Sequence, residues 1–142
     1  MVGGEMFKEK EYERWLKEAK RTLGSAYSDL ENEYYEWASF KAQQSAELAV
    51  KAILRGLGVS PIGHSVTKLL RELSNSGIEV PKDIISFAME LDRHYIAPRY
   101  PDAYPEGSPF EYYSEEIAKE LLSLSEKIIN FVEKLKHELG KT

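Results

Sequence analysis

The chain contains no cysteine. This absence excludes disulfide bonds, thiolate catalysis and cysteine-based zinc sites. The three histidines, His64, His94 and His137, lie on separate segments. Because metal ligands must converge on one point, we expect neither a metal site nor a cofactor. The sequence also has no segment that resembles an N-terminal signal peptide and no apolar run of about 18 residues. We therefore expect a cytoplasmic protein with no membrane partner.

The composition also lacks an excess of basic residues. Against 19 Lys and Arg stand 24 Asp and Glu, which gives a net charge of -5 at pH 7. Proteins that bind duplex phosphates usually carry a basic face, so duplex DNA is not an expected partner. Most of the acidic residues are glutamate, 20 of 24. This glutamate content fits a thermophilic source, and it equally fits any exposed helical bundle.

What the sequence does have is helical periodicity along most of its length. The 142 residues, 42% of them hydrophobic, suit one domain over residues 1–142 with one core. Apolar residues recur at helical spacing in five segments. We expect helices over about 6–32, 35–57, 65–77, 81–95 and 111–139. Short connections between most of them predict an all-α fold, an up-and-down antiparallel helical bundle of four to five helices.

The expected second helix has two different faces. One face is apolar and made largely of small residues between Ala42 and Leu57. The opposite face lies within about 80° of arc and carries Trp37, Phe40, Gln44, Glu47 and Lys51. A helix with two such faces is central in a bundle or contacts a partner subunit. If the polar face is buried, its side chains must form either an internal network or the floor of a pocket.

The connection between the last two helices, about residues 97–110, is rich in proline and tyrosine. Its four prolines exclude a regular helix and favour extended, ordered backbone. A loop of this length in a small bundle is often functional. Arg99 lies among aromatic residues that can form a wall, namely Tyr95, Tyr100, Tyr104, Phe110, Tyr112 and Tyr113.

Two interpretations of Arg99 follow from this setting. An arginine beside tyrosine rings suits a phosphate group with a stacked base. Alternatively, Arg99 pairs with Asp102 or with a helix end, and the tyrosines only cover the bundle.

Three motifs, in this order, resemble those of the HEPN family, the "higher eukaryotes and prokaryotes nucleotide-binding" domain. The pattern Gln44-x-x-Glu47-x-x-x-Lys51 looks like the family's Gln-x-x-Glu-x-x-x-Lys helix. The turn Gly63-His64-Ser65 is similar to its histidine-containing helix start. Leu91-Asp92-x-x-Tyr95, followed by Arg99-Tyr100-Pro101-Asp102, resembles the "RYPD" branch. The resemblance spans about residues 10–135.

The resemblance implies a four- or five-helix bundle that forms homodimers. It also implies a gene beside that of a minimal nucleotidyltransferase, as in toxin–antitoxin pairs, and a role in binding nucleotides or RNA. Many members are metal-independent ribonucleases that use an Arg-x4-6-His motif. None of the six arginines here has a histidine four to six residues downstream, and Arg99 is followed at those positions by Ala103, Tyr104 and Pro105.

We therefore expect a non-catalytic protein, with no catalytic residues, that binds a nucleotide-like ligand or a partner nucleotidyltransferase. The expected ligand-binding residues are Arg99, Tyr100, Asp102, Tyr104, Tyr95, Gln44, Glu47 and Lys51. One alternative is a ribonuclease toxin with a degenerate site that uses Arg93, His94 or Arg99. The other is a purely structural dimerisation module.

Overall fold

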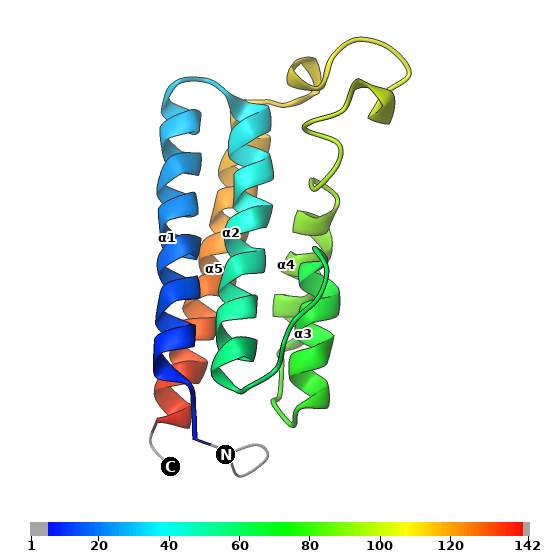
Figure 1. Cartoon of the computed structure of the whole chain (residues 1–142). Coiled ribbons are helices and arrows are strands. Elements are labelled where there is room, and N and C mark those ends of the chain that lie inside the picture. The colour runs from blue at the N-terminus through cyan, green and yellow to red at the C-terminus, as the bar shows by residue number, and fades with distance from the viewer. Residues whose placement is uncertain (1–5, 141–142) are drawn as a thin grey trace.

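A computed structural model describes residues 6–140 of the chain. It contains five α-helices: α1 (Glu9–Glu31), α2 (Tyr35–Gly56), α3 (Val66–Asn75), α4 (Lys82–Asp92) and α5 (Glu115–Leu139) (Figure 1). The described range has no strand. The prediction of an all-α bundle is confirmed.

The bundle is arranged around α2. This helix contacts α1, α3, α4 and α5, as the two faces in its sequence predicted. The helices joined by short turns, α1–α2 and α3–α4, run antiparallel, and the long connection after α4 crosses the end of the bundle before α5 begins (Figure 1). Small residues let α1 and α2 approach closely, because Ala19, Ala42 and Ala46 are fully buried. The buried Ser45 hydroxyl donates to the carbonyl oxygen of Ala19 at 2.7 Å.

Local sequence signals set several helix ends. The Ser65 side chain caps α3 by accepting from the backbone N–H of Lys68, which is the N-cap role expected of it. Gly77 follows α3 with a φ of 92°, a conformation that glycine adopts without strain. The last helix begins later than predicted, at Glu115 rather than near 111. Pro109 starts a separate 3-10 helix (Pro109–Tyr112), and Ser114 then caps α5.

The connection between α4 and α5 is ordered and has short elements of its own. A 3-10 helix over Pro101–Ala103 precedes the one over Pro109–Tyr112. The fourth helix ends at Asp92, before the predicted limit near 95, and residues 93–99 continue as turns. Arg99 therefore follows a series of turns that brings it back toward α2.

None of the helices formed by residues 6–140 has the length and apolar character needed to span a membrane.

Candidate ligand-binding site

Arg99 is held among three aromatic rings. The centre of its guanidinium lies 4.2 Å from the ring centroid of Phe40, 4.7 Å from that of Tyr95 and 5.1 Å from that of Tyr100. Each distance is within the range of a cation–π contact. Phe40 comes from α2, Tyr95 and Arg99 come from the turns after α4, and Tyr100 directly follows those turns. We call these four residues the Arg99 clamp.

Hydrogen bonds fix one edge of the Arg99 guanidinium. Its Nε and Nη2 donate to the carbonyl oxygen of Tyr95 at 2.9 and 2.6 Å. Tyr95 lies in the turns after α4, so this contact is neither the expected pairing with Asp102 nor one with a helix end. No carboxylate in residues 6–140 forms an ion pair with Arg99, and Asp102 has no hydrogen bond with it. The guanidinium is thus positioned without being neutralised.

A row of polar side chains lies beside the clamp on α2, and we call it the α2 polar row: Gln43, Gln44, Glu47 and Lys51. The carboxylate of Glu47 accepts from Gln44 Nε2 at 3.2 Å and from Lys51 Nζ at 3.0 Å. Gln44 also donates to Gln43 Oε1 at 2.8 Å. Glu47 is 3% exposed, so these partners provide the hydrogen bonds that a buried carboxylate requires. These side chains are joined to one another by hydrogen bonds along α2.

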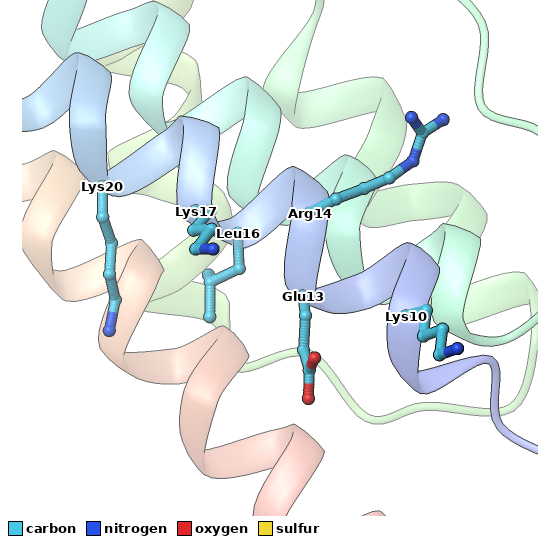
Figure 2. Close-up of a pocket in the computed structure, with 6 residues that line it drawn as sticks. All are labelled: Lys10, Glu13, Arg14, Leu16, Lys17 and Lys20. Carbon is cyan, nitrogen blue, oxygen red and sulfur yellow. The ribbon is translucent and has the colours of Figure 1, made fainter.

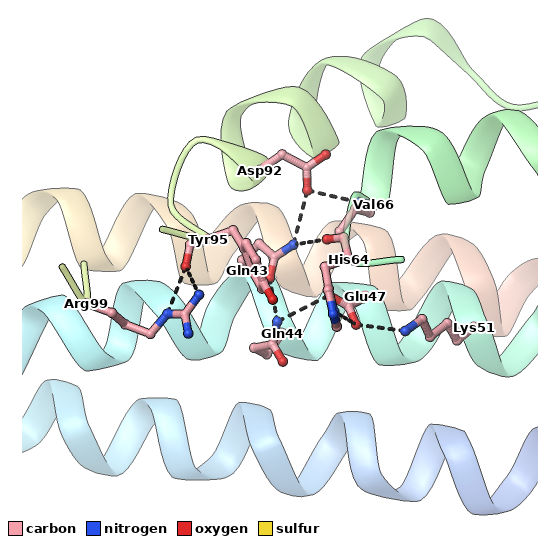
Figure 3. A network of polar contacts seen from close by, with 9 residues as sticks. All are labelled: Gln43, Gln44, Glu47, Lys51, His64, Val66, Asp92, Tyr95 and Arg99. Carbon is pink, nitrogen blue, oxygen red and sulfur yellow. Dashed lines mark hydrogen bonds and ion pairs between the residues drawn. The ribbon is translucent and has the colours of Figure 1, made fainter. Parts of the chain in front are cut away.

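His64 joins the polar row to the clamp. Its Nδ1 lies 3.3 Å from Glu47 Oε2, and its ring stacks on Tyr95 with centroids 5.0 Å apart and an interplanar angle of 14°. The ring of Tyr95 therefore lies between His64 and Arg99 (Figure 3). The His64 side chain is 59% exposed. A cation, an aromatic ring and an imidazole thus follow one another along the surface.

Asp92 is one of two residues of this region that the sequence did not identify as part of the site. Its Oδ1 accepts from the backbone N–H of Val66 at 2.9 Å and from Gln43 Nε2 at 3.1 Å. Its Oδ2 accepts from Ser65 Oγ and from both the N–H and Oγ1 of Thr67, at 2.8 to 3.0 Å. Asp92 thus connects the end of α4 to the first turn of α3 and to α2 (Figure 3). The only signal in the sequence was its place in the Leu91-Asp92-x-x-Tyr95 motif.

Gln43 was also missed, because it falls among the small residues of α2. It is fully buried, and its Nε2 donates to the carbonyl oxygen of His64 at 2.7 Å. This bond holds the turn that carries His64 against the second helix.

The structure does not bring every predicted site residue into this cluster. Arg99, Tyr95 and Tyr100 meet, and Gln44, Glu47 and Lys51 adjoin them through His64. Asp102 is exposed in the 3-10 helix after Tyr100. Tyr104 instead stacks on Tyr112, with centroids 3.9 Å apart. The aromatic loop is therefore divided into two groups rather than forming one wall.

The second group adjoins a pair formed by His94 and Tyr113. The Tyr113 hydroxyl lies 2.7 Å from His94 Nδ1. Burial raises the pKa of the Tyr113 phenol, and burial lowers the pKa of His94 despite the opposing effect of Glu90. The phenol therefore stays protonated beside a neutral imidazole, and the tautomer of His94 decides which of the two groups donates. No group of three or more His, Asp or Glu in residues 6–140 is arranged to hold a metal ion.

The neutral state of His94 predicts a loss of stability in mild acid. Folding lowers the pKa of His94 below its ordinary value of 6.5. As the pH falls, the His94 imidazole therefore takes up a proton in the unfolded chain at a higher pH than in the folded protein. The free energy of unfolding should therefore decrease as the pH drops below about 6.5. The decrease that His94 causes should end once the pH is below the pKa of His94 in the folded protein. Urea unfolding between about pH 7.5 and pH 5.5 measures this slope.

The matched variant His94→Gln lacks the titrating imidazole and should show a shallower slope over the same pH range. Equal slopes in the two proteins would show that other groups cause the acid sensitivity.

Comparison with known proteins agrees with this architecture. The sequence profile of the HEPN domain matches residues 12–135. The "Putative toxin MJ1304" of Methanocaldococcus jannaschii is 29% identical over 135 aligned positions, and the match covers 89% of each chain.

Solved structures agree as well. TT1696 from Thermus thermophilus superimposes with a TM-score of 0.85 at 40% identity, over 87% of this chain and 97% of that one. An HEPN domain protein from Thermotoga maritima superimposes with a TM-score of 0.71 at 41% identity, over 87% of this chain and 98% of that one. ST0689, described as an archaeal HEPN homologue, superimposes with a TM-score of 0.75 at 40% identity, over 88% of this chain and 97% of that one. With a profile match over most of its length and this fold, the chain belongs to the HEPN domain family.

Proposed function

We propose that this HEPN protein is a non-catalytic component of a toxin–antitoxin-type module in the cytoplasm. It binds a nucleotide-like ligand, or a partner minimal nucleotidyltransferase, through the Arg99 clamp and the adjoining α2 polar row. The similarity to "Putative toxin MJ1304" supports the assignment to this type of module. The state of Arg99 supports the binding role, because its guanidinium is held by hydrogen bonds and aromatic rings but has no ion pair with a carboxylate of residues 6–140.

The chemistry of the clamp fits a phosphate next to a planar group. Guanidinium N–H groups bind phosphate oxygens through charge-assisted hydrogen bonds. Tyr100, which is 49% exposed, and the exposed imidazole of His64 offer aromatic surface for stacking. The overall charge of -5 makes a single cationic point more suitable for a small phosphorylated ligand than for a long duplex.

A titration with ADP, followed by the chemical shifts of labelled arginine and histidine side chains, tests the ligand. We expect saturable shifts at Arg99 and His64. Co-purification with a nucleotidyltransferase encoded by an adjacent gene tests the partner. If neither ADP nor such a partner binds, the proposed function is wrong.

A second candidate function, metal-independent cleavage of RNA, is favoured by one observation. The buried Glu47 carboxylate faces His64 Nδ1, and a carboxylate in this position orients an imidazole so that Nε2 can act as a base. The histidine comes from the start of α3 rather than from an Arg-x4-6-His motif. The test is cleavage of a labelled RNA in the presence of EDTA. If the natural protein cleaves the RNA and His64→Ala does not, the protein is a ribonuclease and the non-catalytic binding role is wrong.

We also expect a homodimer. Trp37 on α2 and Ile117 on α5 remain 43% and 37% exposed, and aromatic or apolar surface of this kind is commonly covered by a second copy. Analytical ultracentrifugation at micromolar concentration should show a species of about twice 16.3 kDa. A single 16.3 kDa species at every concentration would contradict the dimer.

A further inference from the structure

A stripe of cations runs along the outer surface of α1. Lys10, Arg14, Lys17 and Arg21 are all exposed and follow one another at intervals of four, three and four residues. At 100° per residue they lie within about 60° of arc, and they extend over about 16 Å of helix. We call these four residues the α1 basic stripe.

Contacts within the fold do not account for the stripe. Arg14 pairs with Glu11 at 2.6 Å, but that arginine side chain is 67% exposed. Lys10, Lys17 and Arg21 have no carboxylate within ion-pair distance in residues 6–140. Like charges three or four residues apart repel one another on a helix. Glu13 and Glu18 flank the stripe and offset part of this repulsion, yet the chain keeps four exposed cations in one row although its net charge is -5.

The surface beside the stripe is hollowed and partly apolar. On one side, a hollow of about 420 Å³ is lined by Leu16 together with Lys10, Glu13, Arg14, Lys17 and Lys20 (Figure 2). A second hollow, of about 350 Å³, is lined by Arg14, Trp15, Glu18 and Leu48. Arg14 lines both. A molecule that pairs with the cations can therefore also bury apolar side chains beside them.

These features fit a protein segment better than a nucleic acid. Arg55 covers a face of Trp15, with its guanidinium 4.4 Å from the ring centroid, and Trp15 is the one aromatic ring among the residues that line the two hollows. A base has little surface there on which to stack. Leucine side chains, by contrast, complement the apolar side chains of an amphipathic helix.

We propose that the α1 basic stripe is a docking surface for an acidic amphipathic helix of a partner protein. Carboxylates spaced three and four residues apart on that helix would match the spacing of the four cations. Apolar side chains beside them would enter the hollows lined by Leu16 and Leu48. The Arg99 clamp is not part of this surface, because α2 separates α1 from the turns after α4. This inference is therefore independent of the proposed ligand site.

Fluorescence anisotropy with the full chain and a labelled synthetic helix tests the docking surface. The probe carries glutamates at the spacing of the stripe with leucines beside them, and a scrambled peptide of the same composition serves as its reference. We expect saturable binding that weakens as salt is raised and that the scrambled peptide lacks. The double variant Lys17→Glu/Arg21→Glu should reduce the affinity about tenfold or more.

The matched control is Lys68→Glu/Arg71→Glu on α3, which applies the same change of charge to two exposed cations that also form no ion pair within residues 6–140. It should leave peptide binding unchanged, and circular dichroism should show that both variants stay folded. Equal losses in the two variants, equal binding of the scrambled peptide, or no binding at low salt would each overturn the proposal. Tighter binding of an oligouridylate, lost in Lys17→Glu/Arg21→Glu alone, would assign the stripe to single-stranded RNA and overturn the protein partner.

Discussion

Replacing Asp92 with alanine is expected to lower the free energy of unfolding by about 2–4 kcal/mol. The side chain accepts five hydrogen bonds, from Gln43, Ser65, Val66 and, twice, Thr67. Two of the donors are backbone N–H groups of the first turn of α3, which have no partner within their own helix. The carboxylate also lies at the positive end of the α3 dipole. Urea denaturation at one protein concentration measures the loss.

Two further variants test whether the loss of stability in Asp92→Ala comes from the loss of the carboxylate itself. Asp92→Asn keeps the shape but replaces one accepting oxygen with a donor, so its loss of stability should be intermediate. Asp83→Ala removes an aspartate from the first turn of α4, where the one hydrogen bond of its side chain within residues 6–140 comes from the backbone N–H of Ile84. That variant should change stability by less than about 1 kcal/mol. A value for Asp92→Ala as small as that of Asp83→Ala would show that the connection between α3 and α4 does not depend on Asp92.

The role of Asp92 also shows where sequence-based prediction reaches its limit in this protein. The helices follow from local signals: the apolar repeat on α2 predicted its buried face, and Ser65 predicted the start of α3. Asp92, in contrast, contacts residues 25 to 49 positions away. No local pattern encodes such a contact, because it arises only when α4 packs beside α3.

The same distinction explains the division of the aromatic loop. Proline content correctly indicated a connection without a long helix, and tyrosine content indicated aromatic packing. Which tyrosines meet depends on the 3-10 helices at Pro101 and Pro109, which turn Tyr104 toward Tyr112 and away from Arg99. Spacing along the chain placed Tyr104 and Asp102 close to Arg99, whereas the backbone turns separated their side chains from the clamp.

For three members of the α2 polar row, by contrast, the sequence was sufficient. Gln44, Glu47 and Lys51 lie three and four residues apart on a long helix, so helical geometry alone placed them side by side. Their hydrogen bonds of 3.2 and 3.0 Å agree with that expectation. The contact of His64 with Glu47 could not be predicted in this way, because it depends on how the connection between α2 and α3 folds back against α2.

Replacing Arg99 with alanine should weaken ADP binding by about 1.5–3 kcal/mol, the contribution of a charge-assisted hydrogen bond to a phosphate. The same change should cost only about 1–2 kcal/mol of stability, because the lost contacts are two hydrogen bonds to Tyr95 and three cation–π contacts at a half-buried site. Isothermal titration with ADP and urea unfolding of the same protein separate the two effects.

Arg99→Lys is the matched control for the geometry of the charge. Lysine keeps the positive charge but lacks the planar fork that donates twice to the carbonyl oxygen of Tyr95, so it cannot be held in the same orientation. Affinity for ADP should therefore fall in the lysine variant too, though less than in the alanine variant. If Arg99→Ala instead binds ADP as tightly as the natural protein and only melts at a lower temperature, the guanidinium serves to fix the turns after α4. The ligand site would then have to lie elsewhere on the bundle.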